Sequence, residues 1–291
     1  MEMHLSKDSW LSWADLKLEE SKAALLGVPW DSSSTAYPGQ RFAVKSIREE
    51  LNLFNAYDFD LKKNVFNSFT DLGNLEVLQG NRKETQERLD STIEKLFERN
   101  PKIIPVFLGG DHSIAYQAVH AMNKAGKKFD YSVFDAHLDL WQEYGNELHH
   151  GNFNRFLFEE NLVEKRMQLG TRTFEENRKS NLKKFKVKSF HLQEIRKKGF
   201  QKAKKEIQKE INKMNKIYLS IDIDVLSPEH CPGTGHPEPE GFSVNELNEL
   251  IKLFKGKIIA ADICEVNPLI DSGRITSVNA AYLLKTILSM L

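Results

Sequence analysis

The sequence predicts an α/β protein with a three-layer α/β/α sandwich, in which a parallel sheet of roughly eight strands lies between two layers of helices. Two observations carry this prediction: short apolar runs recur along the 291 residues, and amphipathic helical patterns separate many of them. Alternation of this kind is typical of a parallel sheet covered on both faces. The strands are expected at residues 23–28, 65–70, 103–108, 130–135, 166–170, 187–191, 216–222 and 257–264.

The intervening helices are recognised by apolar residues that share a face and by capping residues. One helix is expected where a single face carries Leu89, Ile93, Leu96 and Phe97. Another should begin at Ser243, because Ser243 and Glu246 have the spacing of a capping box and apolar residues follow at helical intervals. No repeat or flexible linker divides the chain. We therefore expect one domain over residues 1–291, with residues 1–22 as a peripheral N-terminal arm.

The composition is compatible with a soluble enzyme and disfavours two other classes of protein. With 41 basic and 41 acidic side chains the formal net charge is zero, so no global field attracts nucleic acid or an anionic membrane. No segment approaches the ~20 consecutive apolar residues that span a bilayer, and the first residues lack the apolar stretch of a signal peptide. We expect a cytoplasmic protein whose two cysteines, Cys231 and Cys264, are reduced.

Acidic and imidazole side chains gather where three of the expected strands end. They are His112 after the third run, Asp135, His137 and Asp139 after the fourth, and Asp222 and Asp224 at the end of the seventh. Alternate residues of an extended chain point to one side, and open α/β sheets place their chemistry at the carboxyl ends of strands. Four carboxylates and two imidazoles this close together require cations. Two divalent ions that share bridging carboxylates fit best, and the oxygen and nitrogen ligands suit Mn²⁺, with Fe²⁺, Co²⁺, Ni²⁺ and Zn²⁺ as alternatives.

At these residues the sequence resembles the ureohydrolase family, which includes arginases and agmatinases. The resemblance rests on three motifs, Gly109-Gly110-Asp111-His112-Ser113, Asp135-Ala136-His137-Leu138-Asp139 and Ser220-Ile221-Asp222-Ile223-Asp224. It extends over nearly the whole chain, through residues 27–31, 38–42, 47–49 and 265–268. Blocks at 150–151, 168–172 and 233–239 are most similar to the agmatinase branch.

The resemblance implies an arginase-like fold and a hydrolase that cleaves linear amidines. It implies that one Mn²⁺ is held by His112, Asp135, Asp139 and Asp222, and a second by Asp135, His137, Asp222 and Asp224. Asp135 and Asp222 would bridge the two ions, whose shared water would supply the attacking hydroxide near neutral pH. It also implies a homotrimer or homohexamer that acts on a small guanidino substrate.

Two further residues correspond to catalytic groups of the family. Glu265 corresponds to the carboxylate that accepts hydrogen bonds from the substrate guanidinium, a pairing that suits a planar cation. His150 corresponds to the proton shuttle, because it precedes Gly151-Asn152-Phe153, although His149 is its neighbour. Both residues are therefore also candidates for substrate binding.

The loop before His150 argues for agmatine as the substrate and putrescine as the amine product. Arginases carry two polar residues, four and two positions before this histidine, that read the amino-acid head of arginine; here the positions hold Asn146 and Leu148. Leu148 cannot donate a hydrogen bond to a carboxylate, so a substrate without one is expected.

Other readings stay open at this point. Ser227 and Glu240 depart from the family pattern, and either change could alter the substrate to guanidinobutyrate, guanidinopropionate, guanidine, arginine or formiminoglutamate. A different class of function is a catalytically silent metal-binding scaffold, and another enzyme class is a related deacylase with one zinc. About two ions per chain would favour the ureohydrolase. The sequence assigns no role to His149, His236 or Cys231.

Overall fold

A nine-stranded sheet forms the centre of the computed structural model, which describes residues 3–7, 11, 14, 16–58, 62–65, 68–141, 147–173 and 178–291. The strand order is β1-β5-β2-β6-β11-β10-β7-β8-β9, and only β1 is antiparallel to its neighbour. In that order the strands span Leu5–Ser6, Phe69–Leu75, Ala23–Gly27, Ile104–Leu108, Ile258–Cys264, Ile217–Asp222, Asp130–Phe134, Arg166–Leu169 and Val187–Phe190.

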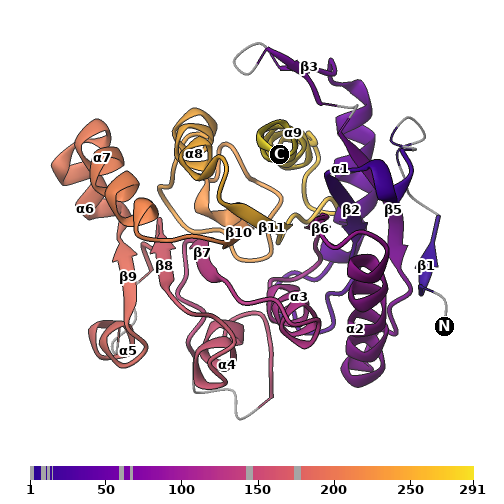
Figure 1. Cartoon of the computed structure of the whole chain (residues 1–291). Coiled ribbons are helices and arrows are strands. Elements are labelled where there is room, and N and C mark those ends of the chain that lie inside the picture. The colour runs from indigo at the N-terminus through magenta and orange to yellow at the C-terminus, as the bar shows by residue number, and fades with distance from the viewer. Residues whose placement is uncertain are drawn as a thin grey trace.

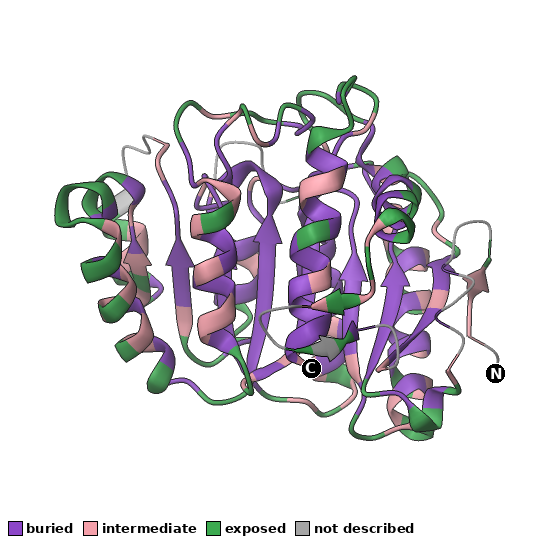
Figure 2. Cartoon of the chain, turned by 90° about the horizontal axis from the view of Figure 1, so that it is seen from above, coloured by how far each residue is buried: buried purple, intermediate pink, exposed green. Residues whose placement is uncertain are grey.

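Helices cover both faces of this sheet (Figure 1). One layer contains α1 (Ala43–Leu53), α6 (Leu192–Lys198), α7 (Phe200–Asn212), α8 (Val244–Ile251) and α9 (Ile275–Met290). The other contains α2 (Arg82–Arg99), α3 (Ser113–Lys124), α4 (Phe153–Glu159) and α5 (Arg178–Lys184). Each layer packs its apolar faces against the sheet in a core of its own, so the central strands are buried from both sides (Figure 2). The predicted three-layer α/β/α arrangement is confirmed.

Short elements complete the described part of the chain. Four 3₁₀ turns span Leu18–Glu20, Gln40–Phe42, Ile223–Val225 and Lys252–Phe254. The two-residue strands β3 (Tyr57–Asp58) and β4 (Lys63–Asn64) pair with each other outside the main sheet. No helix in the described ranges combines the length and hydropathy that crossing a bilayer requires.

Seven of the eight expected strands lie within one residue of their predicted limits, and the second does not. It was expected at 65–70, whereas β5 is Phe69–Leu75. The shift has a physical reason: polar residues such as Asp71 and Asn74 interrupt the apolar pattern, yet both are buried in the sheet. The capping box of α8 is present, with Ser243 Oγ accepting from Glu246 N at 3.2 Å and Glu246 Oε2 accepting from Ser243 N at 2.9 Å.

Arg48 explains why β5 can bury polar residues. This α1 residue is 2% exposed, and its guanidinium donates two hydrogen bonds of 2.8 Å to the carboxylate of Asp71. It also donates to Asn74 Oδ1 and to the carbonyl of Gly73, each at 2.8 Å. The buried charges are thus paired and hydrogen-bonded, which is the condition for burying them.

Removing one partner of this pair should strongly destabilise the fold. Asp71→Ala would leave the Arg48 guanidinium buried without its counter-ion, and we expect a loss of about 3–5 kcal/mol in the free energy of unfolding, measured by urea denaturation. Glu84→Gln, which breaks the exposed pair with Arg88, is the control and should cost about 0.5 kcal/mol or less. An equal effect of both variants would contradict this account.

Candidate metal centre

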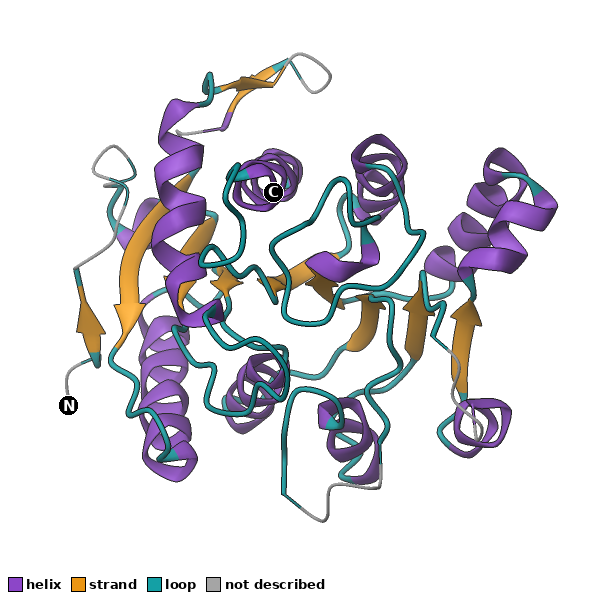
Figure 3. Ribbon diagram, turned by 180° about the vertical axis from the view of Figure 1, so that it is seen from behind, coloured by secondary structure: helices purple, strands orange, loops and turns teal. Residues whose placement is uncertain are grey.

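The candidate site lies at the carboxyl ends of four adjacent strands, β6, β11, β10 and β7. Because these strands are parallel, the residues that follow them emerge at the same edge of the sheet. Loops cross this edge between the two helical layers (Figure 3). A pocket opens there, lined by Thr35, His112, His137, Asp139, Trp141, His149, His150, Gly151, Asp222, Asp224, His236 and Glu265.

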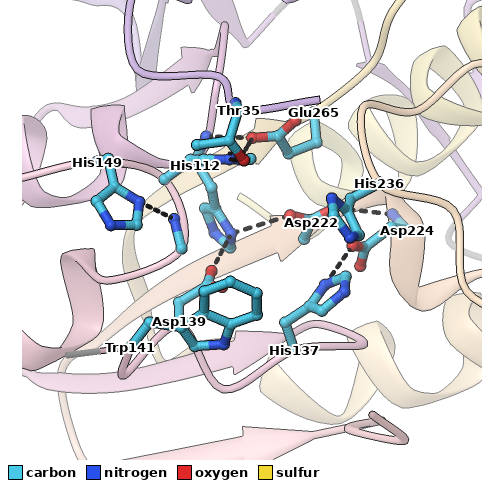
Figure 4. Close-up of a pocket in the computed structure, with 12 residues that line it drawn as sticks. Thr35, His112, His137, Asp139, Trp141, His149, Asp222, Asp224, His236 and Glu265 are labelled. Atoms are coloured by element: carbon cyan, nitrogen blue, oxygen red, sulfur yellow. Dashed lines mark hydrogen bonds and ion pairs between the residues drawn. The ribbon is translucent and has the colours of Figure 1, made fainter. Parts of the chain in front are cut away.

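Three carboxylates converge on one nitrogen of His112, and two of them, Asp139 and Asp222, line the pocket with it (Figure 4). His112 Nδ1 lies 3.3 Å from Asp135 Oδ2, 3.4 Å from Asp139 Oδ2 and 3.1 Å from Asp222 Oδ2. All four side chains are buried. His112 Nδ1 and Asp135 Oδ2 have no hydrogen-bond partner among the described residues, so lone pairs are directed at a common space.

A second group forms around His137. Its Nδ1 lies 2.8 Å from Asp224 Oδ2 and 3.6 Å from Asp135 Oδ1. Asp135 therefore presents one oxygen to each imidazole. Asp222 is held by the backbone of the same turn, since its Oδ1 accepts from Asp224 N at 2.8 Å, while its other oxygen faces His112. The six side chains that the sequence singled out as ligands thus lie together in two groups.

The electrostatics show how strongly these carboxylates interact. Burial and the nearby Asp135 raise the pKa of Asp139 to about 8, and burial with the charges of Asp224 and Asp135 raises the pKa of Asp222 well above its usual range. Burial lowers the pKa of His112, but the adjacent carboxylates of Asp135, Asp139 and Asp222 outweigh burial and raise the pKa. Without cations the cluster must retain protons. Buried nitrogen and carboxylate donors directed at one space fit divalent cations, which would displace those protons.

Glu265 lies beside the metal cluster and is held by three donors. Its Oε1 accepts from His112 N at 2.8 Å and from His150 Nδ1 at 3.1 Å, and its Oε2 accepts from Gln40 Nε2 at 2.9 Å. Burial raises the pKa of Glu265, but His150 and these hydrogen bonds outweigh it and lower the pKa, so the carboxylate is anionic. Gly235 lies close to this carboxylate, and a Cβ at position 235 would come within 2.8 Å of Glu265 Oε2. The absence of a side chain there therefore leaves space next to Glu265.

Two of the functional residues have an unusual backbone conformation. Asp139 has φ of 52° and Glu265 has φ of 64°, in the left-handed region that residues other than glycine rarely adopt. Such strain is found where the surrounding structure holds a side chain in a required position. Glu240, one of the departures from the family pattern that the sequence shows, also has a positive φ, of 62°. Glycine adopts this conformation without the strain that a side chain brings.

His150 is held between Glu265 and a residue that the sequence did not single out, Thr35. The backbone N–H of Thr35 donates to His150 Nε2 at 3.1 Å, and the Thr35 hydroxyl lies 2.7 Å from the same nitrogen. Burial lowers the pKa of His150, but Glu265 outweighs burial and raises it to about 9. Thr35 and Gln40 belong to the polar segment after β2. Gln40 lies within the family-like block at 38–42, whereas the only signal for Thr35 was its position between that block and the one at 27–31.

Neither of the two predicted substrate residues, Asn146 and Leu148, is among the described residues that line the pocket. Asn146 lies outside the described residues. Leu148 is 7% exposed, and its apolar side chain packs in the core on the α2–α4 side of the sheet, so it does not line the pocket.

Aromatic side chains form the rim of the pocket (Figure 4). Trp141 and His149 line it on the side of the loop before α4, and His236 lies at the opposite side with its ring edge-on to His137 at 5.2 Å. Burial, together with His150, Arg155 and Arg82, lowers the pKa of His149 to about 4. Cys231 is buried and does not line the pocket, and its thiol donates to Leu226 O.

The comparisons with known proteins agree with this geometry. Residues 21–289 match the arginase family. The chain is 32% identical to N(1)-aminopropylagmatine ureohydrolase of Thermococcus kodakarensis over 252 residues, 85% of this chain and 83% of that protein. It is 31% identical to formimidoylglutamase of Bacillus subtilis over 269 residues, 90% of this chain and 84% of that protein. The solved structure of the agmatine ureohydrolase of Thermoplasma volcanium matches with a TM-score of 0.84 at 26% identity, covering 98% and 94% of the two chains.

The fold and the site define a hydrolase that acts on amidino compounds. The chain belongs to the arginase family.

Proposed function

We propose that this protein cleaves a guanidino compound to urea and an amine, with agmatine as substrate, putrescine as product and two Mn²⁺ ions in the site. The observation that carries the proposal is the cluster of six His and Asp side chains, five of which line one pocket with Glu265 and His150 while Asp135 lies buried against His112 and His137. A carboxylate that binds a planar cation, a group that moves a proton and a cluster that attracts divalent ions are then within reach of one small substrate.

One ion would be held by His112, Asp139 and one oxygen each of Asp135 and Asp222. The other ion would be held by His137 and Asp224, together with Asp135 and Asp222. When bound, two divalent cations lower the pKa of water enough to supply hydroxide near neutral pH and offset the negative charge that develops on the substrate. Manganese suits the mixture of carboxylate and imidazole ligands.

Glu265 would orient the guanidinium and His150 would move the proton. The anionic carboxylate of Glu265 lines the pocket and pairs with the planar cation, which places the guanidinium carbon over the cluster. In the neutral His150 ring, the N–H of Thr35 marks Nε2 as the acceptor, and Nδ1 carries the hydrogen toward Glu265. A pKa raised to about 9 lets this ring hold a second proton for the departing amine.

The charges on the pocket wall favour a cationic substrate. Among the described residues that line the pocket there is no lysine or arginine, so no permanent positive side chain opposes the distal ammonium of agmatine. The indole of Trp141 offers a face to which a cation is attracted. The named activities of the Thermococcus and Thermoplasma relatives also support this choice.

Acidic amidino compounds are the second candidate class. Arg155 and Arg82 lie close enough behind His149 to lower its pKa, so that side of the pocket has a positive potential. An anionic substrate tail would be attracted to it, and the relative from Bacillus subtilis is a formimidoylglutamase.

The deciding experiment is a substrate panel with Mn²⁺-reconstituted protein. Urea release is measured for agmatine, arginine, guanidinobutyrate, guanidinopropionate and guanidine, and glutamate release for formiminoglutamate. A kcat/KM for agmatine at least tenfold above every other compound would support the proposal. Preference for an acidic compound would keep the chemistry and replace the substrate. Two ions bound with no turnover of any compound would favour a silent scaffold, and one ion would favour a deacylase.

Replacing His150 should slow turnover without emptying the metal site. His150→Asn removes the group that gives the amine its proton, so kcat should fall by roughly 10²–10⁴-fold while about two ions per chain remain. His120→Asn is the control, because His120 hydrogen-bonds Asp90 on the outer helices, and its kcat should be unchanged. Steady-state kinetics with metal analysis of the same samples measures both effects. Full activity of His150→Asn would place the proton shuttle elsewhere.

We also propose a cytoplasmic homotrimer or homohexamer built from one domain per chain. Exposed apolar side chains at Tyr37, Phe42, Leu269 and Ile275 support self-association. Light scattering during size-exclusion chromatography measures the assembly, and a monomer would contradict this part of the proposal.

A further inference from the structure

A buried chain of hydrogen bonds runs beneath the metal cluster, on the side away from the pocket. His112 Nε2 lies 2.9 Å from Ser220 Oγ, and Ser220 Oγ donates to Asp262 Oδ1 at 2.8 Å. Ser220 in β10 and Asp262 in β11 are partners in the parallel register, so the sheet itself sets their distance. His112 is 1% exposed and the other two are fully buried.

The direction of these hydrogen bonds determines which nitrogen of His112 carries hydrogen. The carboxylate oxygen of Asp262 accepts, and it also receives Ile221 N at 3.4 Å and Cys264 Sγ at 3.3 Å. The single hydroxyl hydrogen of Ser220 is therefore used toward Asp262, and the hydroxyl oxygen must accept from His112 Nε2. In the singly protonated ring Nδ1 then has the free lone pair, and Nδ1 is the atom that faces the carboxylates of the metal cluster.

The same side chains do not form a separate metal site. His112, Asp262 and Cys264 approach one another closely enough to suggest one. Their facing atoms are instead used in hydrogen bonds, because the Cys264 thiol donates to Asp262 and His112 Nε2 is engaged by Ser220. Ser220 and Asp262 therefore affect the metal cluster only through their hydrogen bonds to His112 and to each other.

His137 is oriented differently. Its Nε2 lies 3.3 Å from Glu238 Oε1, and the Glu238 side chain is 27% exposed. The two imidazoles thus present the same atom, Nδ1, to the cluster, but one is supported from inside the sheet and the other from a partly exposed loop. A substitution of Ser220 or Asp262 within the sheet should therefore affect only the ion on the His112 side.

We propose that Ser220 and Asp262 are positioning residues that hold His112 in the Nε2–H tautomer and thereby set the affinity of the ion on the His112 side. The inference rests on the proposed two-metal function. Partners behind a metal-binding histidine fix its ring and tautomer, and losing one typically costs about 10–100-fold in metal affinity. Ser220 opens one of the three motifs of the family resemblance, but its contact with His112 was not recognisable from the sequence, and Asp262 lies inside an apolar strand with no signal of its own.

The test is a titration of the metal-free protein with Mn²⁺. Binding is measured by calorimetry and, independently, by the electron paramagnetic resonance signal of free Mn²⁺. The parent protein should bind two ions. Ser220→Ala removes the acceptor of His112 Nε2, and Asp262→Leu frees the Ser220 hydrogen to turn toward that nitrogen. Each should weaken one ion by about 10–100-fold and leave the other unchanged. Asp262→Asn keeps an acceptor oxygen for Ser220 and should retain most of the affinity. Cys264→Ala, which leaves the chain of hydrogen bonds intact, is the matched control.

The outcomes separate this inference from the proposed function. Failure of the parent protein to bind two ions would refute the two-metal function itself. If the parent protein binds two ions and Ser220→Ala and Asp262→Leu bind both with unchanged affinity, only the role of these two residues is overturned. Simultaneous weakening of both ions would also overturn it. The double variant should lose no more affinity than either single one, because both act on the same nitrogen. If Ser220→Ala does not fold, the contrast between Asp262→Leu and Asp262→Asn decides.

Discussion

Asp135→Ala is expected to abolish metal binding and activity together. Asp135 presents one oxygen to His112 and the other to His137, so its removal takes a ligand from both groups at once. Without the hydroxide that the cations supply, kcat/KM should fall by roughly 10⁴-fold or more. Metal analysis and turnover are measured on the same preparation. Two ions in the variant would refute the bridging position of Asp135.

Asp135→Ala should also change the thermal stability of the protein with and without Mn²⁺. Mn²⁺ at 100 times its dissociation constant should stabilise the parent protein by about 2.7 kcal/mol per site, which raises Tm by roughly 5–10 °C. Asp135→Ala should show no such rise. Its metal-free form should unfold earlier than the metal-free parent, because His112 and His137 outweigh burial and hold the pKa of Asp135 below its usual range, so removing this carboxylate loses a favourable charge interaction. Asp130→Asn, at the other end of β7, is the control and should keep both ions.

Glu265→Gln is expected to lose substrate without losing metal. The amide removes the charge that faces the guanidinium and brings an N–H₂ group toward the donors of His112, His150 and Gln40. Breaking a buried, charged hydrogen-bonded pair costs about 2–5 kcal/mol, so kcat/KM should fall by roughly 30- to several-thousand-fold.

The control for Glu265→Gln is Glu87→Gln, which removes an exposed charge of α2 that does not line the pocket. Its kcat/KM should stay within about twofold of the parent value, because an exposed charge is screened by solvent and salt. Steady-state kinetics and Mn²⁺ analysis are compared for both variants. Loss of the ions in Glu265→Gln would show that Glu265 supports the cluster rather than the substrate.

The fold class and the metal cluster were accessible from the sequence because they depend on local patterns. Apolar runs mark buried strands, and Asp135, His137 and Asp139 follow one of them at the spacing that places side chains on one side. Parallel strands then bring their carboxyl ends to one edge, so three separate motifs had to meet. The strand at β5 was misplaced because its buried polar residues have a partner, Arg48, that is distant in sequence.

The supporting residues were not accessible because each acts through a contact between distant segments. Thr35 lies 115 positions from His150, and Gln40 lies 225 positions from Glu265. Asp262 is 42 positions from Ser220, and only the pairing of β10 with β11 brings them together. Gln40 and Ser220 lie in motifs that the resemblance uses and Thr35 and Asp262 do not, but for none of the four does residue type or spacing reveal the distant partner.

The sequence by itself determined which side chains meet at the edge of the sheet, because strand pattern and residue spacing dictate both the layers and the ligand set. The tertiary structure decided how those side chains are held: the shared position of Asp135, the clamp of His150 between Thr35 and Glu265, and the direction of the hydrogen bonds at His112. The physical reason is that hydrogen bonds and buried charges depend on distances of a few ångströms between atoms. Only the packed strands and loops set those distances.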